Sequence, residues 1–404
     1  MSRHVVVVGG GIAATAAALA AARAGAEVTR VAGGPGASVL ATGALDDVPW
    51  EEATGPASPL GGALRDVLDA LVGYRVTDAR ALVATHAGTL RPARGTDRAL
   101  LDLAALPEAR VLVPVLDHLM WDGEALARAW NASPLARGVR FIPVPAPLQK
   151  LADEHQLPDA ELAARHDDPS RVGWLADRLT ELRTHVDGTA VLLPPWLGAS
   201  REVATSLSAK VGVPCGEVLG GVGGPSGARF EHRRDRASAA AGVVVRPGMA
   251  TRVTHREGHD RAWRVALDAG ELEAHAVVLA TGGVLGGGLA YTPATAFLGG
   301  PLPETPRALL HLTCDAPVVL AARGRPLLDP SSLFGAAPES HAWPHVDASL
   351  LDEAGVQVAE DGRVVGAADG LYAAGELAAG CRHTWLAALG SGAIAGSAAA
   401  RSSR

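Results

Sequence analysis

The chain has 404 residues, of which 48% are hydrophobic and 20% charged, so it can bury a large core and is not intrinsically disordered. Acidic residues (43) outnumber basic ones (36) and the formal net charge is −7, which argues against a nucleic-acid-binding surface. The three cysteines, Cys215, Cys314 and Cys381, form no C-x-x-C pair. The sequence therefore predicts no iron–sulfur or structural zinc site within the chain, and it fits a reducing compartment.

The first apolar run, residues 5–22, could be mistaken for a signal peptide or a membrane anchor. Three consecutive glycines at 9–11 interrupt it, and each glycine costs a helix about 1 kcal/mol relative to alanine. The run instead divides into a β-branched strand, a glycine turn and an alanine-rich helix, and a second strand follows at 27–31. The sequence thus predicts a β–α–β unit over residues 4–32.

Strands and helices continue to alternate along the chain, which predicts an α/β fold with a parallel sheet and helices on both faces. The expected helices lie near 60–72, 122–130, 172–186, 201–210, 229–241 and 391–402. The expected strands lie at 111–116, 139–144, 190–193, 243–246, 250–255, 262–267, 272–279 and 370–374.

A G-x-G-x-x-A fingerprint joins the first strand to the first helix, and its residues are Gly9, Gly10, Gly11 and Ala14. Glycines at such a turn let the backbone approach a phosphate, and the helix N-terminus supplies free N–H groups and a positive dipole. Dinucleotide sites usually carry an acid for the adenosine ribose about 20 residues later. Ala32 occupies that position, so the sequence predicts a phosphate cradle without the ribose-binding acid.

Two later strands end in glycine turns. The strand at 276–279 runs into Ala-Thr-Gly, with Thr281 and Gly282, and the strand at 370–374 runs into Gly375 and Glu376. Both turns resemble the later fingerprints of the two-dinucleotide-binding flavoproteins, the superfamily that includes the fumarate reductase flavoproteins. The resemblance implies a Rossmann-like flavin-binding domain.

The same resemblance implies roles for residues near the C-terminus. Glu376 would bind the ribityl chain of the flavin. Ser391 and Gly392 would precede a helix whose N-terminus stabilises negative charge on the reduced ring.

A closer resemblance is to the B subunit of the anaerobic glycerol-3-phosphate dehydrogenase. It covers most of the chain in patches, among them the loop 38–46, which contains Thr42 and Gly43 as implied cofactor-binding residues. The turn 280–283 followed by 287–289 matches the family's Ala-Ser-Gly and Gly-Gly-Leu closely. That family also lacks the ribose-binding acid, and the resemblance implies FMN, with FAD as the alternative. The segment 380–385 departs from the family, so details on the substrate side of the flavin do not carry over.

The resemblance also implies an activity and partners. The chain would be a subunit that passes electrons from the oxidation of glycerol 3-phosphate to glycerone phosphate towards a quinone. A sister flavoprotein subunit and an iron–sulfur subunit docked at the membrane would accompany it. The expected location is cytoplasmic, or peripheral at the inner face of the cell membrane through these partners.

Two alternatives remain from the sequence. One is a stand-alone FAD-dependent oxidoreductase of the fumarate reductase or succinate dehydrogenase type, and the other is a non-catalytic flavin-binding assembly subunit. The stand-alone enzyme needs groups over the flavin, for which Arg229, Arg382 and His383 are the candidates. Guanidinium groups suit carboxylates and phosphates, and a histidine can transfer protons, although each could also be structural or solvated.

The helix at 229–241 carries Arg233, Arg234 and Arg236, which we interpret as a solvated face or a partner surface. The predicted domains are an α/β cap inserted into the flavin-binding domain and a second insertion. Their boundaries are 1–95, 228–290 and 349–404 for the flavin-binding domain, 96–227 for the cap and 291–348 for the second insertion.

Overall fold

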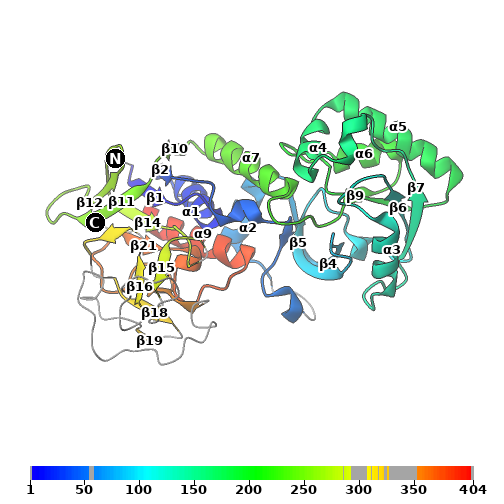
Figure 1. Ribbon diagram of the computed structural model, residues 1–404. Coiled ribbons are helices and arrows are strands. Elements are labelled where there is room, and N and C mark those ends of the chain that lie inside the picture. Colours follow the sequence, from blue (N-terminus) through cyan, green and yellow to red (C-terminus); the bar gives the residue numbers. More distant parts are fainter. Residues whose placement is uncertain are drawn as a thin grey trace, which may run out of the picture. The chain divides into compact units, whose positions relative to one another are not determined.

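The computed structural model describes residues 2–53, 59–284, 286–292, 307–310, 312–316, 318–322, 325–326 and 353–401 (Figure 1). The chain forms two compact units. Unit 1 comprises Met1–Ser38, Leu60–Ala70 and Arg234–Arg404, and unit 2 comprises Val39–Pro59 and Leu71–Arg233. The predicted cap, 96–227, lies within unit 2, which also includes 39–59 and 71–95. Most of the predicted second insertion, 291–348, lies outside the described residues.

Unit 1 is built on a parallel sheet with strand order β10-β2-β1-β14-β21. The strands are β1 (His4–Val8), β2 (Glu27–Ala32), β10 (Val244–Pro247), β14 (Ala276–Leu279) and β21 (Leu371–Ala373). In the register, Val8 lies beside Leu279, and Leu279 beside Ala373. The three glycine turns that follow β1, β14 and β21 therefore meet at one edge of the sheet.

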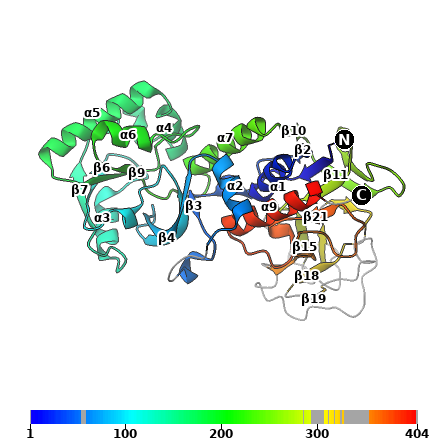
Figure 2. The same ribbon diagram turned by 180° about the vertical axis from the view of Figure 1, so that it is seen from behind.

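Helices cover one face of this sheet, and a second sheet covers the other. Figure 2 shows α1 (Ile12–Arg23), α2 (Gly62–Ala70) and α9 (Trp385–Arg401) together on the helical side. The opposite face packs against the sheet β13-β12-β11-β17 through a core that includes Val6, Val277 and Trp263. Its strands are β11 (Ala250–His255), β12 (Trp263–Leu267), β13 (Gly270–Ala274) and β17 (Thr313–Cys314).

Unit 2 contains a parallel sheet of order β7-β6-β8-β9, with strands β6 (Arg110–Val115), β7 (Arg140–Pro145), β8 (Ala190–Leu193) and β9 (Cys215–Glu217). Side chains alternate along β8, so that Val191 packs under α5 and α6 while Leu192 packs under α3. The helices are α3 (Gly123–Ala132), α4 (Asp159–Arg165), α5 (Pro169–His185) and α6 (Ala204–Val211). The predicted α/β class is confirmed, and in unit 2 helices lie on both faces of the sheet.

An antiparallel sheet of order β3-β5-β4 completes unit 2, with strands β3 (Ala44–Leu45), β4 (Tyr74–Ala84) and β5 (Leu90–Asp97). The long helix α7 (Pro225–Ala240) contains the boundary between the units. The remaining strands are β15 (Leu289–Thr292), β16 (Arg307–Leu310), β18 (Leu320–Ala322), β19 (Arg325–Pro326) and β20 (Gly355–Val356).

Two predicted elements differ from the structure. The strand expected at 272–279 is two strands, because the chain leaves β13 in one sheet and enters β14 in the other at His275, whose N–H donates to the His4 carbonyl at 2.9 Å. The last helix begins at Trp385, six residues before the predicted start at 391. None of the helices in the described part of the chain combines the length and apolarity needed to span a bilayer.

Candidate functional site

The turn between β1 and α1 has the geometry that its fingerprint predicts. Gly9 has φ +145°, and a Cβ placed there would lie 2.2 Å from the Ala280 carbonyl oxygen, so no other residue fits. Ala14 is fully buried, and its Cβ lies 3.1 Å from that same hypothetical atom, which explains why a small residue occupies the third position. The turn is thus held between its own helix and the end of β14.

A loop that follows β2 closes over the turn. A Cβ on Gly10 would lie 1.9 Å from the Gly34 carbonyl oxygen. Ser38 Oγ accepts a hydrogen bond of 2.8 Å from the N–H of Ile12, the first residue of α1. Ser38 therefore satisfies one of the free N–H groups of the helix N-terminus, at the position where a phosphate oxygen would bind. The sequence pattern does not single out Ser38 as a site residue, although it begins the Ser/Gly-rich loop on which the family resemblance rests.

The other two glycine turns converge on the same place. Gly282 has φ +89° and its backbone contacts Gly286 closely, while Gly375 has φ +69° and lies against Ala13 of α1. Glu376 follows in a half-buried position at the edge of the same small cavity, which has a volume of about 80 Å³. The three glycine turns therefore border one cavity.

Thr281 gives this cavity an unsatisfied polar atom. Its Oγ1 is buried and has no hydrogen-bond partner within the described structure, and the residue lines the cavity. A buried hydroxyl without a partner is unfavourable by about 1–3 kcal/mol. A ligand that offers an oxygen or nitrogen here would remove that penalty, so the residues present fit a phosphorylated, hydroxyl-bearing cofactor.

Two buried arginines, Arg30 and Arg234, support the Gly9–Gly11 turn through hydrogen bonds. Arg30 on β2 donates to Thr15 Oγ1 at 3.1 Å, and Thr15 in turn donates to the Gly11 carbonyl at 2.9 Å. Arg234 donates to the carbonyls of Gly10 and Pro35, at 3.3 Å each. Burial, together with the neighbouring charge of Arg234, lowers the pKa of Arg30 to about 10, so Arg30 remains cationic at neutral pH. Asp235 pairs with both arginines, at 3.7 Å from Arg30 and 2.8 Å from Arg234, so the three side chains have a formal net charge of +1 beside the glycine turn.

The expectation that Arg233, Arg234 and Arg236 form a solvated face is wrong for the first two. Arg233 is 4% and Arg234 is 8% exposed, because each is bound within its unit. Only Arg236 of the three is exposed.

The structure changes the roles predicted near the C-terminus. Ser391 and Gly392 lie inside α9 rather than before it. Ser391 Oγ accepts a hydrogen bond of 3.1 Å from Gly375 N–H, so it supports the turn that carries Glu376. A Cβ on Gly392 would lie 2.2 Å from the Ala13 carbonyl oxygen, so this glycine allows α1 and α9 to pack closely.

The N-terminus of α9 follows Thr384, whose Oγ1 accepts from Ala387 N–H at 3.3 Å. Ala388, in the first turn of the helix, lines the cavity. Arg382 and His383 precede the helix and are exposed, and neither is among the residues that line the cavity. Their catalytic role stays a prediction.

Three further predicted residues belong to unit 2. Gly43 has φ +102° and its carbonyl accepts from Asp97 N–H at 2.7 Å, while Thr42 is half-buried. Their part in binding a cofactor stays a prediction. Arg229 is fully buried, and its guanidinium donates to Asp97, Glu217, Ser226 and the Gly198 carbonyl. The expectation that Arg229 faces a substrate is therefore not supported, because its side chain is enclosed by the protein's own acceptors.

Arg229 is the centre of a buried ion cluster formed by Asp97, Glu217, Arg229 and Arg233. Burial opposes ionisation of Asp97, but the charges of the two arginines outweigh it and lower its pKa to about 2. Glu217 contacts only Arg229 among the charged groups of the cluster, and burial raises its pKa to about 7. The cluster joins β5, β9 and α7.

Comparisons with known proteins add little to this geometry. No family model and no curated protein matches the chain. Among solved structures, a flavocytochrome c3 fumarate reductase has 14% identity and a TM-score of 0.36, with 99% of this chain and 78% of that chain covered. Glycine oxidase from Geobacillus kaustophilus has 14% identity and a TM-score of 0.33, with 100% and 96% covered.

The peptidyl tryptophan dihydroxylase QhpG has 13% identity and a TM-score of 0.22, and the match covers 70% of this chain but only 33% of that protein. Similarities at this level do not transfer an activity. Within the described residues no group of three or more His, Cys, Asp or Glu side chains could hold a metal ion.

Proposed function

We propose that unit 1 binds a flavin and that the chain is a flavin-dependent oxidoreductase or a subunit of one. The observation that carries this proposal is the convergence of three glycine turns on one cavity, whose lining includes the buried hydroxyl of Thr281, which has no hydrogen-bond partner among the described residues. The turn at Gly9–Gly11, the N-terminus of α1 and Ser38 would bind the phosphate. Glu376 would accept hydrogen bonds from the ribityl hydroxyls, and Arg30 and Arg234 would favour the phosphate charge from behind.

A bound flavin would supply hydride and electron transfer. The chain's own contribution is to position it. The glycine turns exclude side chains from the cavity, and the N-terminal end of α9 directs its dipole towards the cavity through Ala388. Arg382 and His383 are exposed at the start of that helix, where they could reach a substrate rather than the cofactor's phosphate.

The test is flavin occupancy in a Gly11→Val variant. Gly11 has φ −82°, and a Cβ there would meet only Ser38 Oγ, at 3.2 Å, so the backbone accepts a side chain that blocks the phosphate position. We expect loss of bound flavin with the far-UV circular dichroism spectrum retained. Gly61→Val is the matched control, because a Cβ at Gly61 meets nothing within 4 Å. Equal flavin content in all three proteins would contradict the proposal.

We further propose that the chain is the B subunit of a quinone-linked glycerol-3-phosphate dehydrogenase with FMN as its cofactor. Support comes from the family resemblance and from Ala32, which ends β2 beside Pro247 where an acid for the adenosine ribose would be needed. A sister flavoprotein and an iron–sulfur membrane-docking subunit would be its partners, and the chain would be cytoplasmic or peripheral at the inner membrane face through them. The burial of Arg229 removes one of the three candidates for groups over the flavin in the stand-alone fumarate reductase alternative, and Arg382 and His383 remain.

Mass spectrometry of the flavin released by heat tests the cofactor choice. FMN is expected. FAD at full occupancy would contradict the FMN preference while leaving flavin binding intact. Ala32→Glu adds two acceptor oxygens at the end of β2 and should raise affinity for FAD relative to FMN only if adenosine has room there. Dye reduction by glycerol 3-phosphate, with and without co-purified partners, tests the activity.

A further inference from the structure

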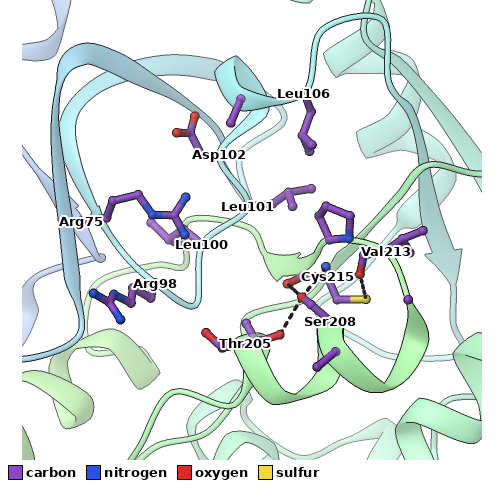
Figure 3. A pocket seen from close by; sticks show the side chains of 15 residues that line it. Arg75, Arg98, Leu100, Leu101, Asp102, Leu106, Thr205, Ser208, Val213 and Cys215 are labelled. Atoms are coloured by element: carbon purple, nitrogen blue, oxygen red, sulfur yellow. Dashed lines mark hydrogen bonds between the residues drawn. The ribbon is translucent and has the colours of Figure 1, made fainter.

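Unit 2 contains a cavity of about 600 Å³ that has no part in the proposed flavin site. It lies between α6 and the chain segment 98–106, which Figure 3 shows on opposite sides. Its size falls within the range of about 300–1,000 Å³ that is typical of small-molecule sites.

Hydrogen bonds fix both walls of this cavity. Leu101 N–H donates to the Glu217 carbonyl at 3.2 Å, and Glu217 N–H donates to the Ala99 carbonyl at 2.8 Å, so the segment runs along β9 like an added strand. On the other side, Ser208 Oγ on α6 accepts from Cys215 N–H at 2.8 Å. These hydrogen bonds hold both walls of the cavity in place within unit 2.

Apolar side chains line one side of the cavity. Leu101, Leu106 and Val213 contribute to it, and Ala209 of α6 adds a small residue. Cys215 also lies here, and burial raises the pKa of its thiol to about 12, so it is uncharged at neutral pH. This side suits a hydrocarbon.

Two arginines face the apolar side, as Figure 3 shows for Arg75 and Arg98. Tyr74 and Asp97 point inward to Arg233. Arg75 follows Tyr74 on β4, where side chains alternate, so it turns to the opposite side. Arg98 lies in the turn directly after β5, and both arginines are exposed.

Neither guanidinium has a hydrogen-bond or ion-pair partner in the described part of the chain. Asp102, the one acid among the described residues of the lining, already accepts hydrogen bonds from the backbone N–H groups of Leu82 and Ala104 through Oδ1, at 3.1 Å each. The cavity thus keeps a net positive charge on one side and a hydrocarbon surface on the other.

We propose that this cavity binds an amphipathic anion: an acyl or alkyl chain with a single carboxylate or phosphate head group. Arg75 and Arg98 would bind the head group through charge-assisted hydrogen bonds. The chain would lie against Leu101, Leu106 and Val213. This site is independent of flavin binding in unit 1.

Isothermal titration calorimetry of the full chain tests the proposal, with octanoate and octyl phosphate below their micelle concentrations. We expect at least one of the two to bind, and the arm that binds identifies the head group. Octanol lacks the charge and inorganic phosphate lacks the chain, so each should bind at least about tenfold more weakly. The double variant Arg75→Gln, Arg98→Gln should lose about tenfold or more in affinity.

Arg140→Gln is the matched control, because Arg140 is an exposed arginine of unit 2 outside this cavity, and its affinity should equal that of the wild type. Ala209→Trp fills the cavity from the exposed side of α6 and should abolish binding. Absence of binding by both anions would overturn the proposal. So would binding that survives the double arginine variant or the Ala209 variant, since a non-specific surface would then explain the heat.

Discussion

At the scale of single residues, Thr281 links the stability of the free protein to cofactor binding. Its Oγ1 is buried without a partner at the cavity, among the residues that the structure describes. In Thr281→Val a methyl group replaces the hydroxyl and the unsatisfied polar atom disappears. We expect the flavin-free protein to become more stable by about 1–3 kcal/mol while its affinity for flavin falls. Thermal unfolding of flavin-free protein and a flavin titration measure the two effects.

Thr15→Val provides the contrast. Thr15 is also fully buried, but its hydroxyl donates to Gly11 and accepts from Arg30. This substitution should destabilise the flavin-free protein, because it leaves Arg30 without that acceptor. If Thr281→Val lowered stability as Thr15→Val does, the Thr281 hydroxyl would have a partner in the protein, and its proposed role toward the cofactor would fail.

At the scale of elements, the close contact between α1 and α9 depends on glycines inside α9. A Cβ on Gly396 would lie 2.1 Å from the Ala17 carbonyl oxygen, whereas a Cβ on Gly390 meets nothing within 4 Å. Gly396→Ala should therefore destabilise unit 1 by about 1–3 kcal/mol through overpacking. Gly390→Ala should stabilise it by about 0.5–1 kcal/mol, since alanine favours a helix. Urea unfolding of both variants measures the two changes in the free energy of unfolding. Equal changes would show that α1 and α9 shift to accommodate the methyl group at Gly396.

The same glycines explain why part of the fold could not be predicted from the sequence. Strands such as β1 and β8 and the helix α1 follow from apolar patterns and glycine turns, and their predicted bounds lie close to the observed ones. Gly390-Ser391-Gly392 has the composition of a turn, so the predicted helix starts at this segment and not before it. The structure continues the helix through these residues because Gly392 packs against a backbone carbonyl 379 residues earlier in the chain. Local sequence carries no sign of such a contact.

The residues of the candidate site also divide into those that the sequence predicts and those that it does not. The residues that make close backbone approaches, Gly9, Gly282 and Gly375, are predictable because only glycine fits there. Arg30, Arg234 and Ser38 are not, since their roles depend on which strands and loops lie side by side. The sequence suggests surface or substrate-facing roles for Arg229 and Arg233, because it does not show that Asp97 and Glu217 enclose them.

At the scale of the whole molecule, the two units respond to different conditions. A flavin bound to unit 1 stabilises that unit by mass action. Unit 2 contains the buried ion cluster, in which the pKa of Asp97 is lowered and the pKa of Glu217 is raised. Because the pKa of Asp97 is lowered to about 2 in the folded protein, its contribution to the free energy of unfolding is complete above pH 3.8. That contribution is lost as the pH falls towards 2.

Glu217 acts in the opposite direction, because its pKa in the folded protein is raised from 4.5 to about 7. Below pH 4.5 it is protonated in both the folded and the unfolded chain and contributes nothing. Between pH 4.5 and 7 it ionises first in the unfolded chain, so the free energy of unfolding falls as the pH rises.

The variant Glu217→Gln removes this titration. We expect the wild type to lose a few kcal/mol relative to this variant across the window, at about 1.4 kcal/mol per pKa unit. Urea unfolding of the wild type and of Glu217→Gln at intervals from pH 4 to 8 measures the difference. Parallel curves for wild type and Glu217→Gln between pH 4.5 and 7 would show that Arg229 keeps Glu217 ionised despite its burial.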